Sequence, residues 1–506
     1  MLAFLGFEHV VKTARTHLVY CCCISSLIVI CITIWACPES LRPIARSTAL
    51  LDELPAEVPA LVHYTHNQGN TSAVIVPDQG NTSVQIVPEQ QPDSASDELS
   101  CAGKRIYMYD LPPAFNFALL EHCRYDLVKW IDFCPHMQNY GFGQVVNSTD
   151  AIFAEDWYGT DAYMLEVIFQ ARLQKYKCLT HSRTDADAFF IPFFTGLDAL
   201  PYLYTNKSLT EMQGPELVRW LQENATDSWQ RHGGHDHFLV AGRTAWDFSR
   251  PLESNRENWG TSLLVLPELV NITAFTLESR TWAATDQAVP YPTGFHPATA
   301  ASLRRWTEQV RTVSRQYLFA FSGALRPGMT TSIRNELYNQ CVNATTRCSL
   351  LDCSKIKCSH NPEPIYSALL RAEFCLQPRG DTATRRSVFD SIIAGCIPVL
   401  FHEDTAYTQY SWHLPITEPE KFSVFIPEEG IKNGSILVEE VLKSYSQTRI
   451  RQMREELITL IPASIYRHPS SEDAELTEKF RDAFDLSVDS MLKKVASFKS
   501  HPSTTG

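Results

Sequence analysis

The chain has few basic residues for its length. Its 506 residues include 44 Lys and Arg against 57 Asp and Glu, which gives a formal net charge of −13. General nucleic-acid binders need an excess of Lys and Arg to neutralise phosphates, so the charge balance excludes that class. A local basic pocket for a single nucleotide is still compatible with it. The length is sufficient for two core-forming domains and accessory segments.

The chain also lacks the paired CxxC motifs typical of zinc-binding domains. Five of its 15 cysteines lie in or next to an apolar stretch near the N-terminus, and ten follow it, at positions 101, 123, 134, 178, 341, 348, 353, 358, 375 and 396. An even number in an oxidising compartment predicts disulfide bonds, whose pairing the spacing does not fix. A zinc cluster of Cys341, Cys348, Cys353, Cys358 and His360 is the alternative, but the spacing favours a disulfide-closed loop.

A long hydrophobic run occurs at residues 18–37 and contains no charged side chain. About 20 such residues span the apolar core of a bilayer. Because Lys12 and Arg15 precede the run, we expect a cytoplasmic tail at 1–17, a transmembrane signal anchor at 18–37 and a lumenal remainder. A cleaved signal peptide is the alternative, but Ala36-Cys-Pro38 is a poor cleavage site.

The segment 38–103 is rich in Pro, Ser, Thr, Gln and acidic residues, and it contains a short tandem duplication at 69–78 and 80–89. Such a composition buries too little apolar surface to offset the entropy of ordering, which predicts a disordered lumenal stem. Asn-x-Ser/Thr sequons agree with a lumenal body, because they are glycosylation acceptors in secreted proteins. They occur at Asn70, Asn81, Asn147, Asn206, Asn224, Asn271, Asn343 and Asn433.

From residue 104 onward the hydrophobic pattern alternates between strands and helices. We expect strands at 105–110, 188–194, 237–240, 263–266, 272–277, 317–322, 374–377 and 423–426, and helices at 161–177, 216–229, 298–315, 331–340, 439–445, 448–460 and 472–495. This alternation predicts an α/β fold with mostly parallel sheets and helices on both faces. We place an N-terminal domain at 104–297 and a C-terminal domain at 298–497.

The most informative stretch is 374–401, which reads as a strand, a polar loop, a helix with a basic start and a second strand. Gly380 frees the loop backbone for positive φ. The helix is expected to begin near Thr384, with Arg385 and Arg386 in its first turn. Cations there are unfavourable unless an anion offsets them, and the first-turn N–H groups add donors for that anion. The pattern indicates a phosphate site, although two solvated arginines on an ordinary helix fit the spacing equally well.

Several motifs in this region resemble the exostosin-like glycosyltransferases of family 47. They are Phe374-Cys-Leu-Gln-Pro378, Gly380-Asp381, Thr384-Arg-Arg-Ser387, Phe389-Asp-Ser391 and Ala394-Gly-Cys-Ile-Pro-Val399. The continuation Ala406-Tyr-Thr-Gln-Tyr-Ser-Trp-His-Leu-Pro415 resembles the plant branch of KATAMARI-type xyloglucan galactosyltransferases. Upstream motifs such as Phe321-Ser-Gly-Ala-Leu-Arg-Pro327 extend the resemblance to about residues 103–490.

The resemblance implies a GT-B-like fold of two Rossmann-like domains facing a cleft, in a single-pass type II protein of the Golgi membrane. The implied reaction transfers a sugar with inversion onto xylosyl branches of xyloglucan, with UDP-galactose as the expected donor. Three alternatives stay open. The donor is UDP-galacturonic acid or UDP-arabinose on the same or another matrix polysaccharide, or the chain is a non-catalytic scaffold in a complex with an active Golgi glycosyltransferase.

The expected donor site lies at the start of helices that follow strands, where open α/β sheets bind ligands. Arg326, Arg385 and Arg386 are expected to hold the departing diphosphate, without a metal or other cofactor. Asp390 is expected on the ribose or on the surface, and Gly380, Asp381 and Ser387 near the phosphate or sugar.

The catalytic base is expected from the N-terminal domain. His237 is the first candidate and Asp236 the second, although a buried structural role fits either residue. Asp185-Ala-Asp187 matches the Asp-x-Asp metal motif of another transferase class, but it precedes a strand instead of following one, so we assign it to a turn.

Overall fold

The computed structural model describes residues 100–500 apart from 126, 130, 206–212, 256–257, 327 and 329–331. Its first sheet has six parallel strands in the order β2-β1-β3-β4-β5-β6. They are β1 (Ile106–Met108), β2 (Leu179–Thr180), β3 (Ala188–Ile191), β4 (His237–Thr244), β5 (Thr273–Glu278) and β6 (Asp286–Ala288). Every residue of β3, β4 and β5 is buried, as expected for a parallel sheet covered on both faces.

The second sheet has five parallel strands in the order β11-β10-β9-β7-β8. They are β7 (Tyr317–Gly323), β8 (Cys348–Asp352), β9 (Ala372–Gln377), β10 (Ile397–Leu400) and β11 (Val424–Phe425). The chain steps from β7 to β8 on one side and then returns to place β9 on the other side. The carboxyl ends of β7 and β9 therefore flank a topological switch point, where such sheets bind ligands.

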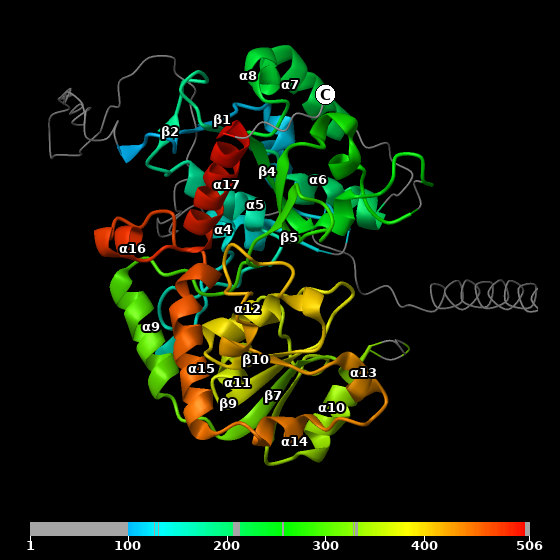
Figure 1. Ribbon diagram of the computed structural model, residues 1–506, viewed down its shortest axis with the longest axis vertical. Helices are drawn as coiled ribbons and strands as arrows, with labels where there is room; N and C mark the ends of the chain where they lie inside the picture. Colours follow the sequence, from blue (N-terminus) through cyan, green and yellow to red (C-terminus); the bar gives the residue numbers. More distant parts are fainter. Residues whose placement is uncertain are drawn as a thin grey trace, which may run out of the picture. The chain divides into compact units, whose positions relative to one another are not determined.

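Helices cover both sheets (Figure 1). Those of the first half are α3 (Phe117–Glu121), α4 (Cys134–Gly141), α5 (Leu165–Leu173), α6 (Thr195–Leu200), α7 (Gln213–Asn224) and α8 (Thr226–Arg231). Those of the second half are α9 (Ala300–Thr312), α10 (Arg334–Asn343), α11 (Pro362–Leu369), α12 (Arg386–Ile393), α13 (Glu428–Lys432), α14 (Val438–Lys443), α15 (Gln447–Leu460), α16 (Ala474–Lys479) and α17 (Ala483–Ser500). Helices α5 and α6 pack on β4, and α12 and α15 pack on β10.

The C-terminal helix α17 returns to the first half of the chain, where Figure 1 shows it in red near α5. Arg172 on α5 lies 2.6 Å from Asp482 and 3.2 Å from Asp485, and all three side chains are largely buried. Phe484 packs on Phe169, and Lys494 donates to Thr273 on β5. From the sequence we placed residues 483–497 in the C-terminal domain, but their contacts are with α5 and β5 of the first half.

All ten cysteines after the apolar stretch form disulfide bonds. The pairs are Cys101–Cys178, Cys123–Cys134, Cys341–Cys348, Cys353–Cys358 and Cys375–Cys396. The alternative of a cysteine zinc cluster is wrong, because none of its four sulfurs is free to bind a metal.

The predicted strand at 263–266 is also wrong, because Leu263–Val265 forms a 3-10 helix. Among the described residues no helix is long and apolar enough to cross a membrane. The predicted tail, the anchor at 18–37, and the sequons Asn70, Asn81 and Asn206 lie outside the described residues, as does nearly all of the predicted stem. The side chains of Asn147, Asn224, Asn343 and Asn433 are exposed and Asn271 is half-buried, so glycosylation at these five stays a prediction.

Candidate functional site

Three arginines gather at the switch point of the second sheet. Arg326 and Arg334 follow β7, and Arg385 follows β9 and is the N-cap residue of α12. The positive charges of Arg326 and Arg385 both act on the guanidinium of Arg334. The loops that leave two neighbouring strands thus bring the same charge to one place.

Arg385 is half-buried, and its side chain has no hydrogen bond or ion pair with any described residue. Burial lowers the pKa of its guanidinium, and the charge of Arg326 lowers it further, against Tyr291 and Asp381, which raise it. A Cβ atom on Gly380 would lie 2.6 Å from Nη1 of Arg385. Gly380 does not use the positive φ that a glycine allows, because its backbone is not left-handed. The glycine instead leaves room for the arginine.

Arg334 is the first residue of α10 and was missed by the sequence analysis. It is buried, and its Nε has no hydrogen-bond partner within the described part of the chain. Burial, followed by the charges of Arg385 and Arg326, lowers its pKa to about 10. A Cβ on Gly323, the last residue of β7, would lie 2.8 Å from its Nη2. The signal was present in the sequence, since Arg334 is also a cation at the start of a helix after a strand.

The described counter-ion of this cluster is Asp381, whose carboxylate lies 3.3 Å from Arg326. Both side chains are well exposed, so the pair is screened and weak. We call Arg326, Arg334 and Arg385 the arginine cluster. With three positive charges against one negative, it is suited to an anion that carries about two charges, and at least two of its guanidinium groups have donors to spare.

Arg386, Ser387 and Asp390 do not join the cluster. Nη1 of Arg386 donates to the Thr160 carbonyl at 2.6 Å, and its Nε lies 3.6 Å from the Asp390 carboxylate. Asp390 is buried and accepts a hydrogen bond from the Tyr366 hydroxyl at 2.9 Å. The Ser387 hydroxyl donates to Gln377. These residues join α12 to its neighbours, so the predicted contacts of Arg386 with phosphate and of Asp390 with ribose are not supported by their geometry.

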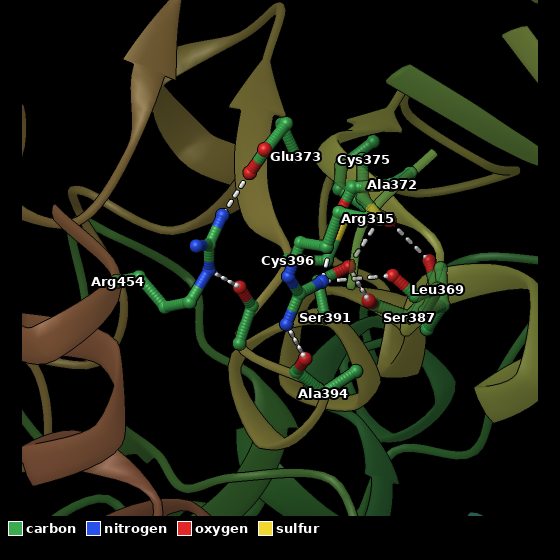
Figure 2. Close-up of a disulfide and its surroundings, with 12 residues drawn as sticks. Arg315, Leu369, Ala372, Glu373, Cys375, Ser387, Ser391, Ala394, Cys396 and Arg454 are labelled. Atoms are coloured by element: carbon green, nitrogen blue, oxygen red, sulfur yellow. Dashed lines mark hydrogen bonds and ion pairs between the residues drawn. A yellow bond between two sulfur atoms is a disulfide. The ribbon is translucent and has the colours of Figure 1, made fainter. Parts of the chain in front are cut away.

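Figure 2 shows the contacts that fix the C-terminal end of α12. The Cys375–Cys396 disulfide joins β9 to the residue directly before β10. Arg315 donates to the carbonyls of Leu369, Ala372 and Ala394 at 3.1, 2.7 and 2.8 Å. Because these carbonyls belong to the end of α11, the start of β9 and the end of α12, one half-buried side chain holds all three elements in register. The loop that carries Arg385 therefore starts and ends on rigid supports.

The carboxyl edge of the first sheet contacts this loop through Glu278, the last residue of β5. Its Oε2 accepts from the backbone N–H and the hydroxyl of Thr384, each at 2.7 Å, and its Oε1 accepts from Trp246 Nε1 at 2.8 Å. Thr384 also bonds to Tyr291 at 2.9 Å. Glu278 thus lies between Thr384, which precedes Arg385 in the second half of the chain, and Trp246 of the first half.

Exposed aromatic side chains gather at that edge of the first sheet. They are Tyr163, Tyr204, Trp246, Trp259 and Trp282. Trp282 is 70% exposed and packs on Trp246 with ring centroids 5.3 Å apart. Arg243, at the end of β4, lies over the Tyr163 ring and pairs with Asp247 at 2.8 Å. We call the five rings the aromatic surface. Flat, exposed rings of this kind pack against the apolar faces of sugar rings.

The two predicted bases lie elsewhere. Asp236 and His237 are at the amino end of β4, about 20 Å along the strand from its carboxyl end. Both side chains are completely buried. His237 bonds to Asp236 at 2.8 Å and to Tyr109 at 2.8 Å, and Asp236 pairs with Arg231 at 2.8 Å. The prediction is therefore corrected, because these residues form a closed structural network remote from the arginine cluster.

The Asp185-Ala-Asp187 motif also lies at the amino edge of the first sheet. Asp187 accepts from the backbone N–H of Arg105 at 2.9 Å, next to the start of β1, as expected for a turn residue. Within the described part of the chain, the group of side chains that fits a metal ion is His136, Asp161 and His360, none of which belongs to the arginine cluster.

The chain is similar to known proteins over most of its length. A model of the Exostosin GT47 domain matches residues 100–443. The chain is 40% identical over 408 residues to a probable xyloglucan galactosyltransferase, GT12, of Arabidopsis thaliana, covering 79% of this chain and 78% of that protein. It is 42% identical to the xyloglucan galactosyltransferase MUR3 of the same plant, covering 80% of this chain and 64% of that protein.

Two further similarities are to another plant relative and to a solved structure. The chain is 38% identical to xyloglucan-specific galacturonosyltransferase 1 of Arabidopsis thaliana, over 78% of this chain and 58% of that protein. Among solved structures, the calicheamicin glycosyltransferase CalG4 is similar over 66% of this chain and 94% of that chain, with 11% identity and a TM-score of 0.27.

Proposed function

Because the chain belongs to the family defined by the Exostosin GT47 domain, we propose that it transfers a sugar from a UDP-sugar onto xylosyl side chains of xyloglucan, with inversion. The names of the relatives support this acceptor, and most of those named above are galactosyltransferases. UDP-galactose is accordingly the proposed donor.

The observation that carries the proposal is the arginine cluster. A departing UDP leaves with a diphosphate whose charge must be offset, and preorganised donors aimed at developing charge are the largest contribution to many enzymatic rates. Arg334 and Arg385 are held against glycines with unused donors, at the switch point where parallel sheets bind nucleotides. A GT-B-like arrangement is supported by the contact of Glu278 with Thr384, which joins the carboxyl edges of the two sheets.

The donor site needs no metal in this proposal, because the arginines supply the charge. Transfer should therefore continue in EDTA at a temperature far below thermal unfolding. Loss of transfer in EDTA that Mn²⁺ restores would contradict the metal-free site.

We propose Glu278 as the catalytic base in place of His237 and Asp236. In the described structure its carboxylate contacts Trp246 of the aromatic surface and Thr384 in the loop between β9 and α12, which we call the donor loop. It would take the proton from the attacking acceptor hydroxyl as the oxygen bonds to the anomeric carbon and the bond to UDP breaks. A positioned general base contributes about 10²–10⁴-fold to a rate.

The aromatic surface is the proposed acceptor site. Xyloglucan is a long, uncharged chain of pyranose rings, and the exposed rings of Trp246 and Trp282 offer stacking contacts without a charge requirement. Its position next to Glu278 directs an acceptor hydroxyl to the donor loop.

UDP-galacturonic acid is the second candidate donor, since one relative is a galacturonosyltransferase. UDP-arabinose is a further alternative. Incubating the full-length chain with each UDP-sugar and desugared xyloglucan oligosaccharides separates them by the mass added. A hexose increment with UDP-galactose is expected. No mass gain with any donor, from folded protein that binds UDP, would indicate the scaffold instead.

We further propose that the chain is a single-pass type II protein of the Golgi membrane, anchored by residues 18–37, and that it associates with other Golgi glycosyltransferases. The apolar run and the sequons support this location. Protection of the C-terminal part of the chain from added protease in intact Golgi vesicles tests the orientation.

A further inference from the structure

Two imidazoles and a carboxylate converge at a place that the proposed reaction does not use. The ligand atoms of His136, Asp161 and His360 all lie within 4.8 Å of one another. His360 Nε2 is 2.7 Å from the Asp161 carboxylate, and the ring centroids of His136 and His360 are 3.8 Å apart. We call these three residues the His-Asp-His cluster.

Each histidine lies two residues after a disulfide-bonded cysteine, His136 in the first turn of α4 and His360 between β8 and α11. His136 follows Cys134, which pairs with Cys123, and His360 follows Cys358, which pairs with Cys353. His360 has φ +58°, a left-handed backbone that is uncommon for residues other than glycine. Such conformations persist where the surrounding structure imposes them, and they gather at functional sites. The imidazoles are therefore brought together by covalent and backbone constraints.

The surroundings supply what an ion site needs. The backbone of Gly159 lies beside the ring of His136. The other Asp161 oxygen accepts from the backbone N–H of Tyr163 at 2.8 Å, which orients the carboxylate. A cavity of about 280 Å³ opens onto both histidines and is also lined by Glu363, so a hydrated ion has room to enter.

We propose that the His-Asp-His cluster binds a divalent cation of the zinc type. Two imidazole nitrogens and one carboxylate oxygen suit Zn²⁺, with water in the fourth position. Tetrahedral bonds of about 2.0–2.1 Å place ligand atoms roughly 3.3 Å apart. Binding would lengthen the 2.7 Å contact between His360 and Asp161 and bring the His136 nitrogen closer to both.

The ion would join the two halves of the chain. His136 on α4 and Asp161 before α5 come from the first half of the chain, whereas His360 lies between β8 and α11 of the second half. An ion bound there stabilises the folded chain, because it binds the unfolded chain less well. The simpler alternative is a metal-free ion pair of His360 with Asp161.

The test uses the full-length chain, stripped with EDTA and then titrated with Zn²⁺. We expect one equivalent to bind and the thermal unfolding midpoint to rise. His136→Gln and His360→Gln should weaken Zn²⁺ binding by at least about tenfold, since even the loss of an outer-shell partner costs that much, and both should lose the thermal shift. His402→Gln is the matched control, because His402 also lies beside a carboxylate, that of Asp404.

Far-UV circular dichroism of each variant shows that it is folded. Failure of the wild-type chain to bind Zn²⁺, or binding by His136→Gln and His360→Gln equal to that of His402→Gln, would overturn the proposal and leave only an ion pair. Transfer activity does not enter the test, so the result is independent of the proposed reaction.

Discussion

Replacing Arg385 with alanine should weaken UDP binding without weakening the fold. Its guanidinium makes no hydrogen bond or ion pair with a described residue, and it lies close to two other arginines. Removing it leaves no partner unsatisfied and reduces like-charge repulsion within the arginine cluster. The free energy of unfolding should therefore stay the same or rise, whereas the diphosphate loses one of its donors.

The size of the effect follows from the hydrogen bond that the substitution removes. A hydrogen bond to a charged group contributes about 1.5–3 kcal/mol, and each 1.36 kcal/mol is a factor of ten. Without one such bond, UDP should bind more weakly by about 10- to 150-fold. Turnover should fall by at least as much, because the bond strengthens as charge develops on the leaving group. Arg385→Lys should restore only part of both, since it keeps the charge but loses the planar geometry.

Isothermal titration with UDP measures the affinity, and denaturant unfolding measures the stability. Arg379→Ala is the matched control, because Arg379 lies in the same loop but pairs with Glu428 at 2.8 Å. Gly380→Ala is an independent perturbation that displaces the guanidinium without removing it. Wild-type UDP affinity in folded Arg385→Ala protein would refute the assignment of the diphosphate to this cluster.

Four further results are expected. Arg386→Ala should lower the free energy of unfolding by about 1.5–3 kcal/mol and leave UDP affinity unchanged, because it breaks a bond to Thr160; a large loss of UDP affinity at full stability would show that it contacts donor. Glu278→Gln should cut turnover by about 10²–10⁴-fold with little change in UDP affinity by titration, whereas turnover within threefold would exclude it as the base. Trp282→Ala should raise the KM for xyloglucan oligosaccharides by about 2- to 13-fold, from a ring contact of about 0.5–1.5 kcal/mol, and an unchanged KM would place the acceptor elsewhere. Burial lowers the pKa of His413 to about 4, so the unfolded chain takes up a proton there below about pH 6.5, before the folded chain does. The contribution of His413 to the free energy of unfolding is therefore lost as pH falls from 6.5 to 4, by about 2 kcal/mol at pH 5. His413→Gln should flatten this slope in denaturant titrations at each pH.

The unit from β9 to β10 was predictable because its signals are local. An apolar run, a polar loop, a helical stretch and a second apolar run appear in the sequence in the order in which the structure has them. The pairing of the cysteines was not predictable, since spacing alone allows many pairings. Strand β8 was missed because its Cys348 and Leu350 were read as part of a cysteine-rich loop.

The site was predicted only in part, because sequence does not give the direction of a side chain. Arg385 and Arg386 are adjacent, yet one joins the arginine cluster and the other crosses to Thr160. Arg334 has the same position at a helix start and was overlooked. The error at His237 was avoidable, since a residue before a parallel strand lies at the edge opposite the ligand site. Glu278 carried no local signal, because its role depends on a contact between residues 106 positions apart.

The most direct test of the central claim is an experimental structure of the full-length chain with bound UDP. The arginine cluster predicts diphosphate oxygens at about 2.7–2.9 Å from the guanidinium nitrogens of Arg334 and Arg385, the usual length of such charged contacts. The uridine should lie next to the carboxyl ends of β7 and β9. UDP bound elsewhere, with Arg334 and Arg385 out of contact with its phosphates, would contradict the account.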